Sequence, residues 1–252
     1  MRFASLGSGS KGNATLVQAG DTLLMIDCGF SLRETTRRLA ILGLQPQQLD
    51  AILVTHEHSD HCSGVAALSR KHEIPVYLTH GTSSAGRCDN CFSTRHLKLG
   101  DRFELGCVQV EAIAVPHDAK EPCQYRFFHG GKSLGILTDL GSITPHVVDS
   151  YRGCDGLVLE FNHDRQLLQQ GVYPYHLKQR VGGDWGHLNN MQAAALLGKI
   201  GHAGLRHLVV AHVSEKNNSR GHAEQALLSV LSSLDDVVWA DQANGFDWLL
   251  LD

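Results

Sequence analysis

The chain has 252 residues, of which 42% are hydrophobic and 19% are charged, so its composition is that of a folded globular protein and excludes a disordered one. Its formal net charge of −4 excludes a global basic field of the kind that attracts nucleic acid, so any nucleic-acid contact requires a local basic patch. No repeat or long linker divides the chain. We therefore expect a single domain over residues 1–252.

The seven cysteines are scattered without a repeating framework, which argues against a disulfide scaffold and favours a reducing compartment. The sequence shows no apolar signal segment, and no stretch approaches the ~18 apolar residues that cross a bilayer. We expect a cytoplasmic protein without a membrane partner. No obligate protein partner is indicated.

The predicted elements begin with three strands, RFASLG, ATLVQAG and TLLMIDCG, and the first two flank a turn built on GSGSKGN. A helix is predicted over residues 31–42, because Ser31 and Glu34 match a capping box and Gly43 occupies the position of a C-cap glycine. A buried strand, DAILVT, precedes the helix VAALSRKH and the strand PVYLTH. Further strands are VQVEAIAV, KSLGILTD and GLVLEF.

The last third of the chain is predicted to alternate helices and strands. Asp164 is expected to cap a short helix, RQLLQQ, that Gly171 ends, and Asn189 to begin a longer helix, NMQAAALLGKI. The strand RHLVVAH follows, then a helix over about residues 223–232 and a final hairpin of VVWA and FDWLLL, turned by QANG. Continuous apolar strands mixed with helices predict two sheets packed between helical layers.

Six of the apolar strands carry an imidazole or a carboxylate at or next to their C-terminal end. These residues are Asp27, His56, His117, Asp139, Glu160 and His212. Ligands collect beyond the carboxyl ends of strands in open sheets, so we expect these side chains to converge on one site. Imidazoles and carboxylates together are suited to zinc, manganese or iron.

The segment THEHSDH, at residues 55–61, concentrates the same chemistry. His56 and His58 are two residues apart, so they can point the same way from an extended segment. Asp60 and His61 follow where the chain turns into a helix, so they can face a second position. This spacing suits two metal ions about 3.5–4 Å apart that share a water and a carboxylate, and Asp139 is the natural bridging candidate.

THEHSDH resembles the signature of the metallo-β-lactamase fold superfamily, and the order of the other strand-end groups matches across nearly the whole chain. The resemblance implies an α/β fold, the αββα four-layer sandwich. It also implies seven ligands to two divalent metal ions, with a triad for each ion and one aspartate between them. The resemblance assigns His56, His58 and His117 to the first ion and Asp60, His61 and His212 to the second. Asp139 is the aspartate between them. Asp27 corresponds to the strand-end aspartate that supports the site.

Among the branches of this superfamily, the chain resembles the phosphodiesterases. A redox branch has glutamate in place of His58, and we expect no helical thioesterase domain because a hairpin follows soon after His212. The ribonuclease Z and β-CASP nucleases have an acidic residue after the bridging aspartate, then a histidine before an alanine-rich helix, and then the last metal ligand. In this chain those places are filled, in order, by Glu160, His187 and His212. SLGSGSKGNAT, LTDLGSITPH, NHDRQLLQQGVYPYHLKQRV and GHLNN resemble the YycJ/WalJ-like family of single-domain nucleases. The inserted β-CASP domain is absent.

The resemblance implies a metal-dependent phosphodiester hydrolase whose substrate is nucleic acid, most simply DNA attacked from an end. Two zinc or manganese ions, with iron as the alternative, would supply the activated hydroxide. The expected catalytic residues are Asp60, His187 and Glu160. His187 would donate a hydrogen bond or a proton to the phosphate, and Glu160 would orient it.

Lys11, Lys178 and Arg180 are candidate substrate contacts, and a solvated charged face is the alternative for the last two. Cys88 and Cys91 form a lone CxxC pair, for which a structural zinc and two ordinary loop cysteines both stay open. Two other functions stay open as well. One is a small-molecule hydrolase acting on a thioester, a lactone or a cyclic phosphodiester. The other is a metal-dependent nucleic-acid-binding protein without turnover, against which the complete ligand set argues.

Overall fold

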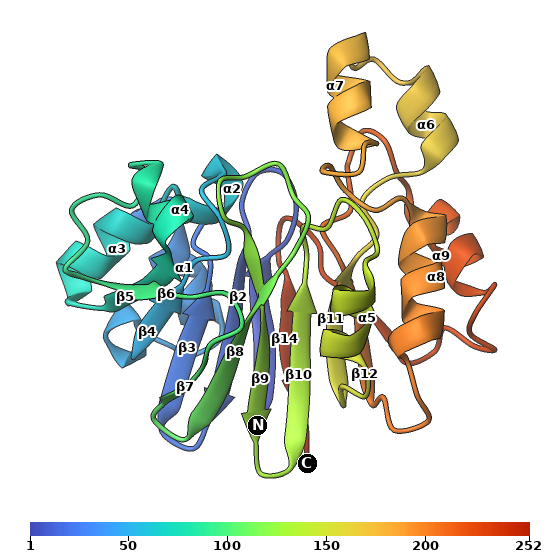
Figure 1. Cartoon of the computed structure of the whole chain (residues 1–252). Coiled ribbons are helices and arrows are strands. Elements are labelled where there is room, and N and C mark those ends of the chain that lie inside the picture. The colour runs from blue at the N-terminus through green and yellow to red at the C-terminus, as the bar shows by residue number, and fades with distance from the viewer.

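Fourteen strands form two seven-stranded sheets that pack face to face in the computed structural model, which describes residues 1–252 (Figure 1). The first sheet runs, from edge to edge, β14 (Phe246–Leu250), β1 (Arg2–Gly7), β2 (Ala14–Ala19), β3 (Thr22–Ile26), β4 (Ala51–Leu53), β5 (Pro75–Thr79) and β6 (Ser93–Leu97). The second runs β13 (Val237–Trp239), β12 (His207–Ala211), β11 (Gly156–Glu160), β10 (Lys132–Leu137), β9 (Cys123–His129), β8 (Val108–Ala114) and β7 (Arg102–Leu105).

Helices cover the outer face of each sheet, which gives four layers (Figure 1). On the side of the first sheet lie α1 (Leu32–Ile41), η1 (Pro46–Gln48), α3 (Val65–His72) and α4 (His80–Ser84), and on the side of the second lie α5 (Pro145–Tyr151), α8 (Asn190–Ile200) and α9 (Arg220–Leu227). The short α2 (Ser59–Cys62) lies at one end of the sandwich. This arrangement confirms the predicted αββα sandwich.

Apolar side chains fill the space between the layers in three clusters. One lies between the sheets and includes Phe3, Tyr125 and Phe127, all fully buried. The other two lie between a sheet and its helices, one around Leu39 and Leu68 and one around residues of α5, α8 and α9. Strands that are apolar on both faces, as the sequence predicted, are thus buried on both faces. None of the helices combines the length and apolar character that crossing a bilayer requires.

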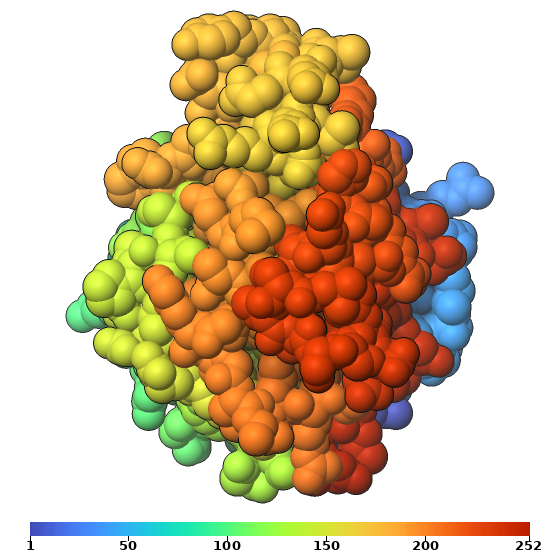
Figure 2. Space-filling model, turned by 90° about the vertical axis from the view of Figure 1, so that its right-hand side faces the viewer, coloured from blue at the N-terminus to red at the C-terminus, as the bar shows by residue number.

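Two helices stand apart from the four layers. α6 (Arg165–Gln170) and α7 (Tyr175–Val181) form a helical hairpin that rises above the rest of the molecule (Figures 1 and 2). Asp164 caps α6 as predicted, because its carboxylate accepts hydrogen bonds from the backbone N–H groups of Gln166 and Leu167, both at 2.9 Å. No residue of α7 is fully buried.

The parallel pairing in each sheet decides where the site can form. β3, β4 and β5 are parallel to one another, and so are β10, β11 and β12, so the carboxyl ends of each set lie at one end of its sheet. α2 and the α6–α7 hairpin lie at that end, whereas both chain termini lie at the opposite end (Figure 1). The strand-end imidazoles and carboxylates are therefore delivered to one end of the sandwich.

Two local predictions need correction. Ser31 caps α1 by accepting a hydrogen bond from the N–H of Glu34, but the capping box is only half formed because the Glu34 carboxylate bonds Arg37 and Arg38 instead. The helix expected at residues 223–232 spans Arg220–Leu227, because Ser219 caps it three residues earlier.

The predicted C-terminal hairpin is wrong. β13 pairs in parallel with β12 of the second sheet, whereas β14 pairs antiparallel with β1 of the first. The QANG turn, closed by backbone hydrogen bonds between Asp241 and Gly245, carries the chain from one sheet to the other. The QANG sequence predicts a turn whether the two flanking strands pair with each other or belong to different sheets. The turn signal therefore could not show that β13 and β14 have other partners.

A buried hydroxyl links the two sheets, and removing it should weaken the fold. Tyr125 on β9 donates a hydrogen bond of 2.8 Å to the carbonyl of Val54, just after β4. Tyr125→Phe should lower the free energy of unfolding by about 1 kcal/mol, the usual worth of one such bond, as measured by urea denaturation. Tyr77→Phe is the control, because Tyr77 is half-buried and stacks on Phe103. Equal stability of Tyr125→Phe and the wild type would contradict this role.

Candidate metal centre

Seven imidazoles and carboxylates meet where the carboxyl ends of the two sets of strands converge. From the first sheet come His56 and His58, after β4, with Asp60 and His61 on α2; from the second come His117 after β8, Asp139 after β10 and His212 after β12. Their ligand atoms fall into overlapping groups, within each of which all atoms lie within 4.8 Å of one another. Two of these groups are the triads His56–His58–His117 and Asp60–His61–His212 that the sequence predicted.

Asp139 lies between the two triads. Its Oδ1 is 3.7 Å from Nε2 of His117 and 3.6 Å from Nδ1 of His212, and its Oδ2 is 3.3 Å from Nε2 of His61. The carboxylate is fully buried and reaches imidazoles of both triads. A bridging ligand would need this position, and the bridging role of Asp139 stays a prediction.

Hydrogen bonds on the outer side of the cluster orient three of the imidazoles. Nδ1 of His61 donates to Asp27 at 2.8 Å, and Nδ1 of His117 donates to the Gly186 carbonyl at 2.9 Å. Nδ1 of His56 lies 2.9 Å from the hydroxyl of Thr55. When Nδ1 carries the proton, Nε2 keeps a lone pair directed into the cluster. This is the usual arrangement of metal-binding histidines.

The donor set fits a divalent cation. Three buried atoms in the cluster have no hydrogen-bond partner: Nε2 of His56, Oδ2 of Asp139 and Nδ1 of His212. Such atoms cost free energy unless something else satisfies them. Burial alone would lower the pKa of His212, but the carboxylates of Asp139, Asp60 and Glu160 together outweigh burial and raise that pKa to about 10. The field of the carboxylates thus favours positive charge at the centre.

The backbone around the ligands is strained or tightly packed. Asp27 and His212 both have left-handed conformations, with φ of 61° and 52°, which non-glycine residues adopt rarely. Gly29 packs closely against the segment that carries His58, Asp60 and His61. A Cβ at position 29 would lie 1.8 Å from the carbonyl oxygen of Asp60. Asn13 donates to the same carbonyl at 3.3 Å. The GSGSKGN turn, which contains Asn13, therefore supports the loop that carries Asp60.

His187 and Glu160 form a pair beside this cluster, as predicted. Nδ1 of His187 donates to Oε2 of Glu160 at 3.1 Å and lies 3.6 Å from Oδ1 of Asp139. Glu160 is fully buried, and its Oε1 accepts from the backbone N–H groups of Leu140 and Leu188 at 2.7 and 3.3 Å. Three donors therefore fix the carboxylate, which in turn fixes the imidazole.

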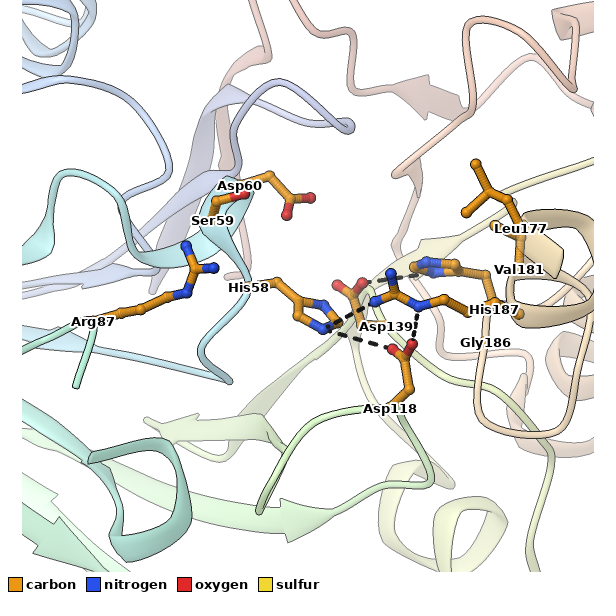
Figure 3. A pocket seen from close by; sticks show the side chains of 11 residues that line it. His58, Ser59, Asp60, Arg87, Asp118, Asp139, Leu177, Val181, Gly186 and His187 are labelled. Carbon is orange, nitrogen blue, oxygen red and sulfur yellow. Dashed lines mark hydrogen bonds and ion pairs between the residues drawn. The ribbon is translucent and has the colours of Figure 1, made fainter. Parts of the chain in front are cut away.

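The three candidate substrate contacts have different surroundings. Arg180 reaches the cluster, where it pairs with Asp118 and its Nη2 lies 3.4 Å from Nε2 of His58 (Figure 3). Lys178 instead donates to the Gln169 carbonyl of the same hairpin at 2.7 Å. Lys11 pairs with Glu215 at 2.6 Å on the surface. The structure thus brings only Arg180 to the cluster.

Sequence reasoning missed two charged residues here. Asp118, which follows His117, has its Oδ1 3.4 Å from Nε2 of His117 and 3.7 Å from Nε2 of His58. Arg87 lines the same cavity as Arg180, on the side opposite His187 (Figure 3). The signal for Asp118 was its place beside a candidate ligand, whereas nothing in the sequence set Arg87 apart.

The CxxC pair does not gather metal ligands. Cys88 is buried, Cys91 directs its thiol to the Cys88 carbonyl at 3.0 Å, and no group of potential metal ligands contains a cysteine. His80 and His96 stack on each other at 4.0 Å. Ordinary structural cysteines are the better interpretation.

A family model described as a beta-lactamase superfamily domain matches residues 22–213. The chain is 34% identical over 249 residues to exodeoxyribonuclease WalJ of Streptococcus pneumoniae, covering 95% of this chain and 91% of that protein. It is 33% identical over 238 residues to exodeoxyribonuclease YycJ of Bacillus anthracis, covering 92% and 89%.

Two solved structures share the whole fold. One is the metallo-beta-lactamase fold protein YhfI from Bacillus subtilis, with a TM-score of 0.76, 17% identity and coverage of 98% of each chain. The other is Zn²⁺-bound PqqB from Methylobacterium extorquens, with a TM-score of 0.74, 17% identity and full coverage of both chains. At this identity the likeness establishes the fold alone.

The bond between Asp27 and His61 should control metal affinity. In Asp27→Asn, the amide N–H₂ group would face Nδ1 of His61, so the imidazole should move its proton to Nε2 and lose its lone pair toward the cluster. Asparagine tolerates the left-handed backbone. We expect metal affinity to fall by about 10–100-fold, measured by competition with a chelator. The matched control is Asp50→Asn, a carboxylate that accepts from the N–H of Leu23. Unchanged affinity in Asp27→Asn would contradict the assignment.

Proposed function

The chain belongs to the metallo-β-lactamase superfamily, in the family of the exodeoxyribonucleases WalJ and YycJ, and on this premise we propose that it removes nucleotides from an end of DNA. It is a metal-dependent hydrolase of phosphodiester bonds. The observation that carries the proposal is the pair of adjoining ligand triads with Asp139 between them and the His187–Glu160 pair at their edge. We propose that residues 1–252 act as one domain.

We propose two divalent metal ions, zinc or manganese, with iron as the alternative. His56, His58 and His117 would hold the first, and Asp60, His61 and His212 the second, with Asp139 shared. When bound, such ions neutralise charge on the phosphate oxygens and lower the pKa of the attacking water. Asp60 would in addition accept a hydrogen bond from that water and so orient it toward the phosphorus.

His187 would supply the proton that the leaving oxygen needs. Because its Nδ1 is committed to Glu160, its Nε2 is the atom available to the substrate. Glu160, fixed by the N–H groups of Leu140 and Leu188, holds the ring in one orientation. A histidine positioned in this way can act as a general acid.

The cavity beside the cluster suits a phosphodiester. It has a volume of about 350 Å³ and is lined by both Arg87 and Arg180, and Figure 3 shows Arg87 across the cavity from His187. Arg180 is held by Asp118 and therefore lies preorganised at the edge of the cluster. Guanidinium groups bind phosphate oxygens through paired N–H donors. The two arginines bring positive charge to a cavity whose lining also includes Asp60, Asp118 and Asp139.

The α6–α7 hairpin extends this surface away from the body of the protein (Figure 2). Tyr175 at the start of α7 and Trp185 just beyond it are 77% and 63% exposed. Aromatic rings of this kind stack on bases of single-stranded nucleic acid whatever their sequence. We propose that the strand runs along the hairpin before it reaches the metal centre.

End-labelled DNA tests the proposed function most simply. Metal-free protein reloaded with Zn²⁺ or Mn²⁺ should release nucleotides from labelled single- or double-stranded DNA, and the Asp60→Ala/His61→Ala double variant should release none. Labelled RNA run in parallel defines the sugar preference. No cleavage of either polymer, together with hydrolysis of a thioester, a lactone or a cyclic phosphodiester, would move the assignment to a small-molecule hydrolase.

His187 should affect turnover and not metal binding. We expect His187→Ala to lower kcat on DNA by ~10²–10⁴-fold, the usual worth of a general acid, with unchanged metal content by elemental analysis. His146→Ala, which removes an exposed imidazole on α5, is the matched control. Loss of metal in His187→Ala would instead make this residue a ligand.

A further inference from the structure

A second cavity lies on the other side of the metal cluster. It has a volume of about 110 Å³, against about 350 Å³ for the cavity that contains Arg87 and Arg180. Asp60, Val181 and His187 line both cavities and so form the partition between them. The larger cavity also exposes His58, from the first triad, and the smaller exposes His212, from the second.

The smaller cavity contains a buried amide without partners. Asn217 is only 1% exposed, and neither Oδ1 nor Nδ2 of its side chain has a hydrogen-bond partner. Its backbone is nevertheless fixed, because its N–H donates to the Ser214 hydroxyl at 3.2 Å and its carbonyl accepts from Asp164 at 2.8 Å. An unpaired buried amide is costly and rare in native proteins. A ligand with both a donor and an acceptor would satisfy it.

The other walls of this cavity have the same character. Ser10 and Ser214 contribute hydroxyls and Asn162 a second amide, while Tyr173, from the turn between α6 and α7, contributes an aromatic ring. The volume is well below the ~300 Å³ at which sites for whole drug-sized ligands begin. The cavity therefore suits one planar polar ring and not a larger group.

We propose that the smaller cavity binds the base of the terminal nucleotide, while the larger cavity receives the phosphates of the remaining strand. The inference rests on the proposed nuclease function and deepens it. The paired donor and acceptor of an asparagine side chain match the edge of a base, and a tyrosine ring offers a stacking surface that every base accepts. The phosphate between the two cavities then lies beside Asp60 and His187, which form the partition.

This division explains why cleavage would occur one nucleotide from the end. Because the smaller cavity has room for one base, the first internucleotide phosphate is the one that reaches His187. A second base would not fit in the smaller cavity and would have to lie outside it. The product is therefore a single nucleotide, with its base against Asn217 until it dissociates.

Product binding tests the inference separately from cleavage. The metal-loaded protein is titrated calorimetrically with each of the four deoxynucleoside monophosphates and with deoxyribose 5-phosphate, which lacks the base. The wild type should bind at least one nucleotide about 10-fold more tightly than the sugar phosphate. Asn217→Ala and Tyr173→Ala should each lower this ratio about threefold or more, and the double variant should bring it close to one. Asn244→Ala, which removes an exposed amide on the 241–245 turn, should leave it unchanged.

The outcomes separate the inference from the proposed function. Equal binding of nucleotides and sugar phosphate by the wild type would overturn the base site, even if DNA is cleaved, and would leave the cavity to water. A full ratio in the double variant would overturn the assignment of its walls. Base-dependent binding without any DNA cleavage would support the base site and contradict the nuclease function.

Discussion

The structure depends on holding imidazoles and carboxylates together in a buried cluster while leaving some of their polar atoms unpaired. Such unpaired atoms oppose folding. The fold limits this cost because hydrogen bonds fix the imidazoles on the outer side of the cluster. Asp27 orients His61, and the Gly186 carbonyl orients His117. Bound cations would satisfy the remaining atoms, so metal binding and the stability of this end of the sandwich are linked.

In the proposed function, the α6–α7 hairpin extends the ligand cluster into a site for a polymer. Arg180, from α7, reaches the larger cavity, and Tyr173, from the turn before α7, lines the smaller one. Val181, at the end of α7, lies on the partition between the two cavities. The hairpin thus contributes the positive charge of Arg180, the aromatic ring of Tyr173 and part of the wall between the two cavities. The candidate ligands, in contrast, all come from the layered body of the protein.

The sequence predicted best what depends on long apolar strands. Residues at the ends of such strands must meet once the strands are parallel. The sequence could therefore predict that the candidate ligands lie close together, although their roles stay predictions. Pairing between distant segments could not be foreseen, which is why VVWA and FDWLLL were placed in one hairpin. The same limit hid Arg87 and Asn217, whose importance comes from loops that meet only in the folded chain. β9 was missed although CQYRFFH alternates apolar and polar residues from Cys123 to Phe127, and Cys123, Tyr125 and Phe127 are its buried apolar residues.

The central claim is that this cluster holds two metal ions, one at each triad. Anomalous X-ray scattering from crystals of the protein loaded with manganese or zinc tests it most directly, because it locates each metal without reference to activity. Two peaks are expected, one among His56, His58 and His117 and one among Asp60, His61 and His212, with Asp139 contacting both. A single peak, or peaks outside the cluster, would contradict it.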